Sequence, residues 1–590
     1  MKKARLSFIF IFSFAYLSVC AQHRFTIDLN DISDDLFKVT VIPNNLNEQN
    51  NIFQFASIAP GTYQIMDIGR FVRTFTAYDK NGDILDTEQI STNQWKLSDP
   101  THTAKIEYTI AETWDTPVTE HVVYNMCGTS LENDHAFINP HAVLGYFHGM
   151  QAHELWIKID HPQEWVTGTA LTKNTEDYYT ASTYDFVVDS PILLGRLSKA
   201  SLDVEGTQVD IFSYSKTDLI RSSDILDDLK DILFAASKFT NGLPVDRYVF
   251  LYHFEDIDYG AWEHSYSSIY VMKEAPFDEF RTTMFRSIAA HEFYHVVTPL
   301  NIHSELIEQF NYETPELSQH LWLYEGVTEW AALAMQVRDG IMTLDEYLHQ
   351  INIKLMTNDA FEPGLSLVEL GVNATALQDQ YANIYAKGAV TAGMLDLLLL
   401  KKSKGKRGLR EVINELSEKY GPHRPFDETN FFDELVQTTN PEVEAFIEKY
   451  IKGSETLPLK EYFEYVGINY TEFAGYDSTK ASLGLGLTVS GNDIVISKVN
   501  EDIKEIKTGD ILRSMDGMEI TLQNAQEAFG KFHQKKAGDS ISFIFLRGEE
   551  TVNVDMILPA QKISHQFEVM TKPKRKQLKL RDHWITNSSQ

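Results

Sequence analysis

The stretch His291-Glu292-Phe293-Tyr294-His295 decides how this chain of 590 residues is interpreted. On a helix, residues i and i+4 share one face, so the two imidazoles can bind a single metal ion. Glu292 is offset from that pair and can reach a water molecule bound to the same ion. Met284 and Ile288 continue the histidine face backwards and are expected to pack the helix onto a core. The pattern therefore predicts a helix that carries a metal site.

Glu325 is the candidate for a third ligand. It lies in Leu321-Trp322-Leu323-Tyr324-Glu325-Gly326-Val327-Thr328, with 29 residues between it and His295. Two histidines and one carboxylate leave the fourth position of Zn²⁺ open for water, whose pKa the ion lowers toward about 7. Glu329 follows four residues later on the same face. It is expected to accept a hydrogen bond from one ligand histidine, and the alternative is an ordinary surface glutamate.

This metal motif resembles that of the gluzincin zinc metallopeptidases, and its long spacing to Glu325 resembles the glycyl-aminopeptidase family within them. Further segments carry the same resemblance over nearly the whole chain after residue 21. They are Ala59-Pro60-Gly61-Thr62-Tyr63 with Asp67 and Arg70, Gly260-Ala261-Trp262-Glu263-His264, and Tyr385-Ala386-Lys387-Gly388-Ala389.

The resemblance implies catalytic and substrate-binding roles. Tyr385 matches a tyrosine that stabilises the oxyanion, with Tyr381 as a weaker candidate one turn earlier. The segment with Gly260, Glu263 and His264 matches the one that holds the free amino group of the substrate, for which a desolvated carboxylate is suited. A buried core tyrosine and an ordinary edge-strand glutamate are the structural alternatives.

The pattern of short alternating strands and longer apolar helices predicts a multidomain α+β protein. We expect an N-terminal β-rich domain, a thermolysin-like catalytic domain with a helical part, and a C-terminal PDZ-like β domain. The expected ranges are a signal peptide at 1–21, then domains at 22–199, 200–466 and 467–560, and a basic tail at 561–590. The tail is expected to be solvated, and the alternative is a docking segment.

The C-terminal module carries a second motif, Leu483-Gly484-Leu485-Gly486-Leu487, before Lys507-Thr508-Gly509-Asp510. It resembles a PDZ domain. The resemblance implies that the backbone N–H groups of Gly484, Leu485, Gly486 and Leu487 hold the carboxylate of a C-terminal peptide ligand that adds a strand. The alternative is a groove used only for packing on the catalytic domain.

Composition limits the remaining possibilities. The 52 basic and 84 acidic residues give a net charge of −32, which argues against a nucleic-acid partner. Lys2, Lys3 and Arg5 precede an apolar run at 8–19, which predicts export after cleavage before Gln22. The residue before Cys20 fits a lipid anchor poorly, and no transmembrane segment is expected. Cys127 would then be the one remaining cysteine, buried as a small hydrophobe.

The leading hypothesis is an exported zinc aminopeptidase that cleaves peptides after a small N-terminal residue, glycine or alanine. Glu292 would activate the zinc-bound water. One alternative is a zinc endopeptidase without an amino-group anchor. The other is a peptide-binding PDZ protein in which the metallopeptidase-like domain is idle.

Overall fold

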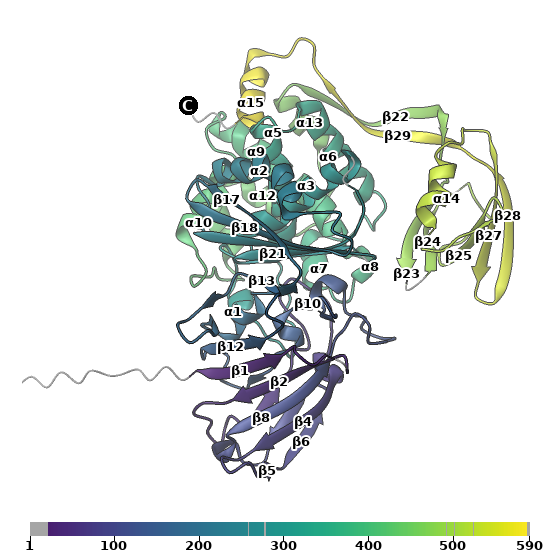
Figure 1. Cartoon of the computed structure of the whole chain (residues 1–590). Helices are drawn as coiled ribbons and strands as arrows, with labels where there is room; N and C mark the ends of the chain where they lie inside the picture. Colours follow the sequence, from purple (N-terminus) through teal and green to yellow (C-terminus); the bar gives the residue numbers. More distant parts are fainter. Residues whose placement is uncertain are drawn as a thin grey trace, which may run out of the picture.

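The computed structural model describes residues 22–586 apart from 33, 258, 277–278, 491–492, 501 and 523. The expected signal peptide at 1–21 lies outside the described residues. The chain forms the expected multidomain α+β structure, with a β-rich domain, a helix-rich domain and a C-terminal β module in chain order (Figure 1).

The N-terminal domain consists of three sheets around one apolar core. The largest sheet has the strand order β14 (Thr172–Lys173), β15 (Tyr179–Ala181), β12 (Leu155–Asp160), β1 (His23–Asp28), β2 (Leu36–Ile42), β8 (Lys105–Ala111), β4 (Val72–Tyr78) and β5 (Ile84–Leu85). The second has the order β13 (Val166–Thr169), β16 (Ile192–Gly195), β10 (His135–Ile138) and β9 (Ser130–Leu131). The third has the order β11 (Tyr146–Phe147), β3 (Ile52–Gln54), β7 (Gln94–Leu97) and β6 (Thr87–Ser91).

The second domain combines one sheet with a group of helices. Its sheet has the order β17 (Ser198–Val204), β18 (Thr207–Ser215), β19 (Arg247–Glu255), β21 (Ser267–Lys273) and β20 (Gly260–His264), with β20 antiparallel at the edge. The main helices are α2 (Ser222–Thr240), α3 (Glu279–Tyr294), α5 (Thr328–Arg338), α6 (Leu344–Asn358), α9 (Asn383–Ser403) and α10 (Leu409–Lys419). Shorter helices are α7 (Leu367–Val372), α8 (Gln378–Tyr381), α11 (Phe431–Thr438), α12 (Glu442–Tyr450) and α13 (Leu459–Tyr465).

Strand β19 shows why the first two domains pack so closely. Its apolar residues are buried on both faces of the sheet, which explains a continuous rather than alternating apolar run. One face contacts the helices through Tyr248, Phe250, Tyr252 and Phe254, and the other joins the N-terminal core through Val249 and Leu251. The boundary between the domains is therefore a hydrophobic core.

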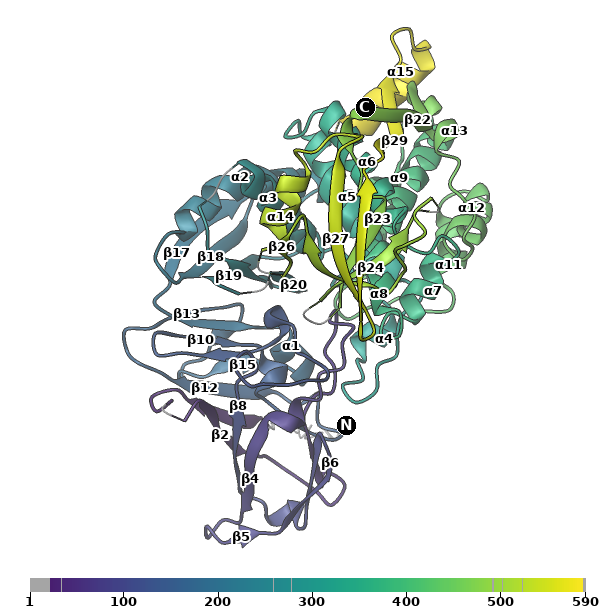
Figure 2. The same cartoon turned by 90° about the vertical axis from the view of Figure 1, so that its right-hand side faces the viewer.

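The C-terminal module stands to one side on a long two-stranded ribbon (Figures 1 and 2). The ribbon pairs β22 (Ile468–Ala481) with β29 (Ala560–Val569). Between them lie β23 (Leu485–Ser490), β24 (Asp493–Val499), β25 (Ile511–Met515), β26 (Met518–Glu519), α14 (Ala525–Phe532), β27 (Ser540–Arg547) and β28 (Glu550–Ile557). Strand β23 lies at the edge of its sheet.

The prediction of a solvated tail at 561–590 is wrong for most of that range. Residues up to 569 belong to β29, and α15 (Arg575–Ile585) packs against the helical domain. Trp584 is buried, and the Arg581 guanidinium donates to the carbonyls of Val466 and Gly467 at 2.7 and 2.6 Å. Arg575, Lys576 and Lys579 face solvent, while Leu580 and Trp584, one turn apart, anchor the helix.

Within the part of the chain that the structure describes, no helix is both long and apolar enough to cross a bilayer. Cys127 is fully buried, as expected.

Candidate metal centre and active site

Helix α3 and the following helical segment bring three potential metal ligands together. Both histidine Nε2 atoms face the Glu325 carboxylate, at 3.4 Å from His291 and 3.6 Å from His295. All three side chains are buried, and their ligand atoms lie within 4.8 Å of one another. The predicted ligand set is thus assembled as one group.

The opposite nitrogen of each histidine is already occupied. His291 Nδ1 lies 2.7 Å from Glu329 Oε2, and His295 Nδ1 lies 2.9 Å from the carbonyl oxygen of Thr298. Such contacts fix the tautomer and leave each Nε2 lone pair for a metal. Glu329 is buried and its other oxygen pairs with Lys354 Nζ at 2.5 Å, so the surface-glutamate alternative does not describe it.

Glu325 lies on a π-helical turn, η5 (Trp322–Val327), that runs into α5. Such turns often re-aim a side chain at a functional site. Gly326 and Gly388 let this turn approach α9 closely, because a Cβ built on either glycine would lie 2.7 Å from the other's Cα. This close approach places Glu325 and the start of α9 beside the same centre.

Glu292 has the environment of a general base. Its Oε2 atom is buried and has no hydrogen-bond partner among the described residues. Burial raises the pKa of the Glu292 carboxyl to about 8, against the opposing charge of His291, and Glu325 adds to the rise. A general base needs an oxygen that is free to accept a proton, and Oε2 of Glu292 is such an atom among the described residues.

Glu263 enters the same centre from edge strand β20. One of its carboxylate oxygens lies within 4.8 Å of ligand atoms of both Glu292 and His295. Burial raises the pKa of Glu263 well above its usual value, and the carboxylate of Glu325 adds to the rise. Among the described residues no Lys or Arg pairs with it. A cationic group from outside the chain would therefore complete this environment.

The N-terminal domain contributes to this centre through the segment at 59–63. Gly61 has a φ of +76°, and a Cβ there would lie 2.6 Å from Glu263 Oε1. Trp262 Nε1 donates to the Pro60 carbonyl at 3.2 Å. The glycine is thus required both by its backbone conformation and by the approach of Glu263.

Three tyrosines form the next part of the site. The Tyr385 ring lies 5.6 Å from the His291 ring, and its hydroxyl is 2.8 Å from that of Tyr381. Tyr63 packs on Tyr381 with ring centroids 5.2 Å apart. Burial raises the pKa of the Tyr385 hydroxyl well above its usual value, and Glu325 adds to the rise, so the hydroxyl stays protonated and can donate.

Two neighbours of Glu263 are not brought into the metal centre. His264 lies on the other face of β20, where its Nδ1 atom is 3.4 Å from the Asp189 carboxylate. Gly260 packs against Met126, whose sulfur would lie 2.6 Å from a Cβ at that position. Their predicted substrate-binding roles have no support from direct proximity to the ligands.

The four predicted carboxylate-loop residues lie at the start of edge strand β23. Gly484 has a φ of +67°, its N–H donates to Ser482 Oγ at 3.2 Å, and Leu485, Gly486 and Leu487 pair with β24. The free edge of β23 is suited to adding a strand.

A cavity of about 760 Å³ lies between the N-terminal domain and the second domain and borders Glu263. Its walls come from both domains and include Gly61, Tyr63, Trp262 and His264. Asp185, Asp189 and Glu308 also line it. The cavity thus lies beside Glu263 and is lined by carboxylates from both domains.

The sequence motifs did not identify Lys354, which pairs with Glu329, or the Thr298 carbonyl, which contacts His295 Nδ1. Lys354 lies on α6 with no local motif around it, and a backbone carbonyl leaves no trace in residue type. The Thr298 carbonyl also accepts from Thr328 Oγ1 at 3.2 Å.

Comparisons with known proteins identify two regions of the chain. Residues 24–196 match the model of the peptidase M61 N-terminal domain, and residues 284–390 match that of the M61 glycyl aminopeptidase. No curated protein matches the chain significantly.

The solved structures that are similar to this chain include the following two. An aminopeptidase N family protein from Idiomarina loihiensis has a TM-score of 0.78 at 21% identity, covering 96% of this chain and 100% of that one. An M1 zinc metallopeptidase from Deinococcus radiodurans has a TM-score of 0.48 at 11% identity, covering 75% and 95%. At this identity the first likeness supports the fold of the chain.

Proposed function

The chain belongs to the M61 glycyl aminopeptidase family of zinc metallopeptidases, and from that premise we propose that it removes small N-terminal residues, glycine or alanine, from peptides. The observation that carries the proposal is the carboxylate of the half-buried Glu263 beside Glu292 and His295. It has no cationic partner among the described residues, and the α-ammonium group of a peptide supplies one.

The residues present fit a zinc ion. His291, His295 and Glu325 would hold it, because both imidazoles are oriented by their Nδ1 contacts and the donor set is the one that catalytic zinc prefers. The ion would supply a Lewis acid that polarises the substrate carbonyl and lowers the pKa of water.

Side chains of the chain itself would transfer the proton, stabilise the oxyanion and bind the substrate N-terminus. Glu292 would accept the proton of the attacking water at its unpartnered Oε2 atom and pass it to the leaving amine. Tyr385 would donate its hydroxyl proton in a hydrogen bond to the developing oxyanion, while the neighbouring Tyr381 hydroxyl orients it. Glu263 would fix the N-terminus, so that the first peptide bond is the one presented.

Paired peptides test the proposal. Glycyl and alanyl peptides should be cleaved at the first bond, and the same peptides with an acetylated N-terminus should resist. Equal cleavage of free and acetylated peptides would favour an endopeptidase. Glu292→Gln should abolish cleavage while zinc content and folding are retained, and full activity of this variant would refute the assigned base.

A peptide-binding role of the C-terminal module is a second candidate, supported by edge strand β23 with its glycine-containing start. We propose that this module resembles a PDZ domain and receives a peptide C-terminus along β23. A library of peptides with free C-termini should give binders to the full chain whose affinity is lost on C-terminal amidation. If no member binds, the groove serves packing only.

A further inference from the structure

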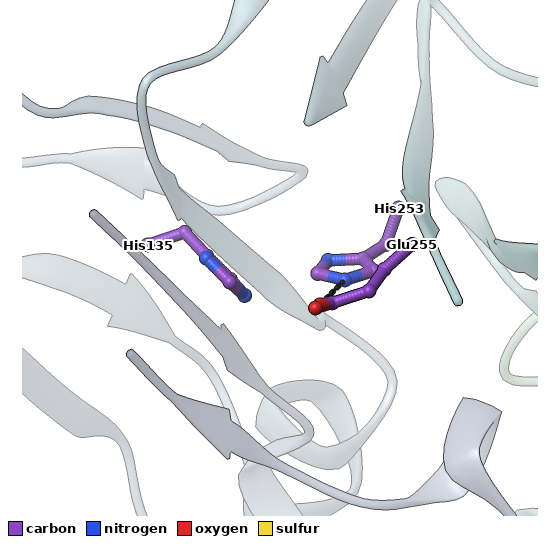
Figure 3. A group of neighbouring side chains, drawn as sticks. All are labelled: His135, His253 and Glu255. Atoms are coloured by element: carbon purple, nitrogen blue, oxygen red, sulfur yellow. Dashed lines mark hydrogen bonds and ion pairs between the residues drawn. The ribbon is translucent and has the colours of Figure 1, made fainter. Parts of the chain in front are cut away.

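A second group of metal-ligand side chains lies at the boundary between the two large domains. It consists of His135 on β10 of the N-terminal domain and His253 with Glu255 on β19 (Figure 3). One ligand atom from each lies within 4.8 Å of the other two. None of these residues lines the cavity beside the peptidase centre. The group is thus separate from the site described above.

His135 is prepared as a ligand by its surroundings. Its Nδ1 atom lies 3.0 Å from the Asp134 carboxylate, which fixes the ring and its tautomer. Its Nε2 atom is buried and has no hydrogen-bond partner in the part of the chain that the structure describes. Figure 3 shows this ring directed toward His253 and Glu255. An unpaired buried nitrogen is costly, and a bound cation would satisfy it.

His253 and Glu255 supply the other two ligands. His253 is fully buried, its Nε2 atom lies 3.2 Å from Glu255 Oε2, and its Nδ1 atom has no partner among the described residues. A metal ion would take the place of the proton shared by Nε2 and the carboxylate, and Nδ1 would carry the ring proton instead. The Lys216 ammonium pairs with the other oxygen of Glu255.

The protonation states agree with this geometry. Burial lowers the pKa of His135 to about 4, with His253 adding to the decrease, and burial lowers that of His253 too. Both rings are therefore neutral near pH 7, which is the form that binds metals. The His253 hydrogen bond lowers the pKa of Glu255 to about 2, so its carboxylate is ionised.

We propose that His135, His253 and Glu255 form a second zinc site that joins the N-terminal domain to the sheet of the peptidase domain. Two imidazoles and one carboxylate suit Zn²⁺ better than the oxygen-preferring Mg²⁺ or Ca²⁺. Glu255 is partly exposed, which gives water access to the fourth position. Aromatic rings enclose the histidines, with Tyr214 centred 3.9 Å from His135 and Trp114 4.9 Å from His253. Because its ligands come from β10 and β19, the ion would link the two domains.

Zinc stoichiometry tests this site without reference to catalysis. In a His291→Ala/His295→Ala variant the peptidase centre is removed, so zinc loading followed by gel filtration should leave one ion per chain. Adding His135→Asn or Glu255→Gln should remove that ion. Adding His423→Asn, at an exposed histidine that belongs to neither group, should leave it in place.

Circular dichroism identifies any variant that fails to fold. If His135→Asn fails to fold, Glu255→Gln takes its place as the test variant. Zinc-edge anomalous diffraction from crystals of the full chain should give a peak between His135 and His253. A folded His291→Ala/His295→Ala variant that retains no zinc would overturn the proposal. So would retention of its ion after Glu255→Gln.

Discussion

Replacing Gly61 with alanine tests whether the N-terminal domain shapes the peptidase centre. The new Cβ would start 2.6 Å from Glu263 Oε1, whereas ordinary contacts begin at 3.4 Å, so the carboxylate must retreat by 3.4 − 2.6 = 0.8 Å. A misplacement of about 1 Å in a positioned group costs on the order of 10²-fold in rate. We therefore expect kcat/KM for a free glycyl peptide to fall by about 100-fold, or about 2.7 kcal/mol.

Gly82→Ala is the matched control. Gly82 has a φ of +87°, close to the +76° of Gly61, but a Cβ there meets nothing within 4 Å. Both variants should lose about 1 to 2 kcal/mol of stability from the strained backbone, and only Gly61→Ala should lose activity. Stopped assays with free and acetylated peptides, beside urea unfolding, measure both effects. A folded Gly61→Ala variant with wild-type kcat/KM would refute the reasoning, as would equal losses of activity in the two variants.

Three further predictions concern the interior. Glu329→Gln should weaken zinc binding by about 10- to 100-fold through the loss of the carboxylate on His291, measured by chelator competition. Arg338→Met should lower the free energy of unfolding by about 3 to 5 kcal/mol in urea, because Asp396, 3.2 Å away and buried, loses its cation. Burial raises the pKa of Glu112 from its usual 4.5 to about 8, so folding favours the protonated form and stability falls as the pH rises between these values. Glu112→Gln should therefore raise the melting temperature at pH 8 and leave it nearly unchanged at pH 4.5, by differential scanning calorimetry.

The candidate metal-ligand group could be predicted because its geometry is mostly local. The spacing of His291 and His295 fixes their common face on a helix, and Glu325 was identified from the segment around it. The sequence did not decide whether Glu329 contacts a ligand histidine or lies on the surface. This contact depends on how α5 packs against α3, which brings the Glu329 carboxylate to His291, and this packing has no signature in spacing alone.

The C-terminal tail was misjudged for a different reason. Its many basic residues indicated solvation, but a helix needs only a narrow apolar stripe to dock. Leu580 and Trp584 supply that stripe at a spacing of four residues, and both are buried. The charge on the exposed face of this helix does not determine whether its other face is buried. The spacing of the apolar residues was therefore the better indicator of docking.

The N-terminal domain is part of the peptidase centre rather than an addition to it. Gly61 admits the Glu263 carboxylate, and Tyr63 supports Tyr381, which in turn contacts Tyr385. The sheet of the second domain also buries one face of β19 against the N-terminal core. A fragment that began near residue 200 would expose that apolar face to water and would lose the walls that place Glu263. Since both losses arise at one boundary, stability and substrate positioning are coupled in this fold.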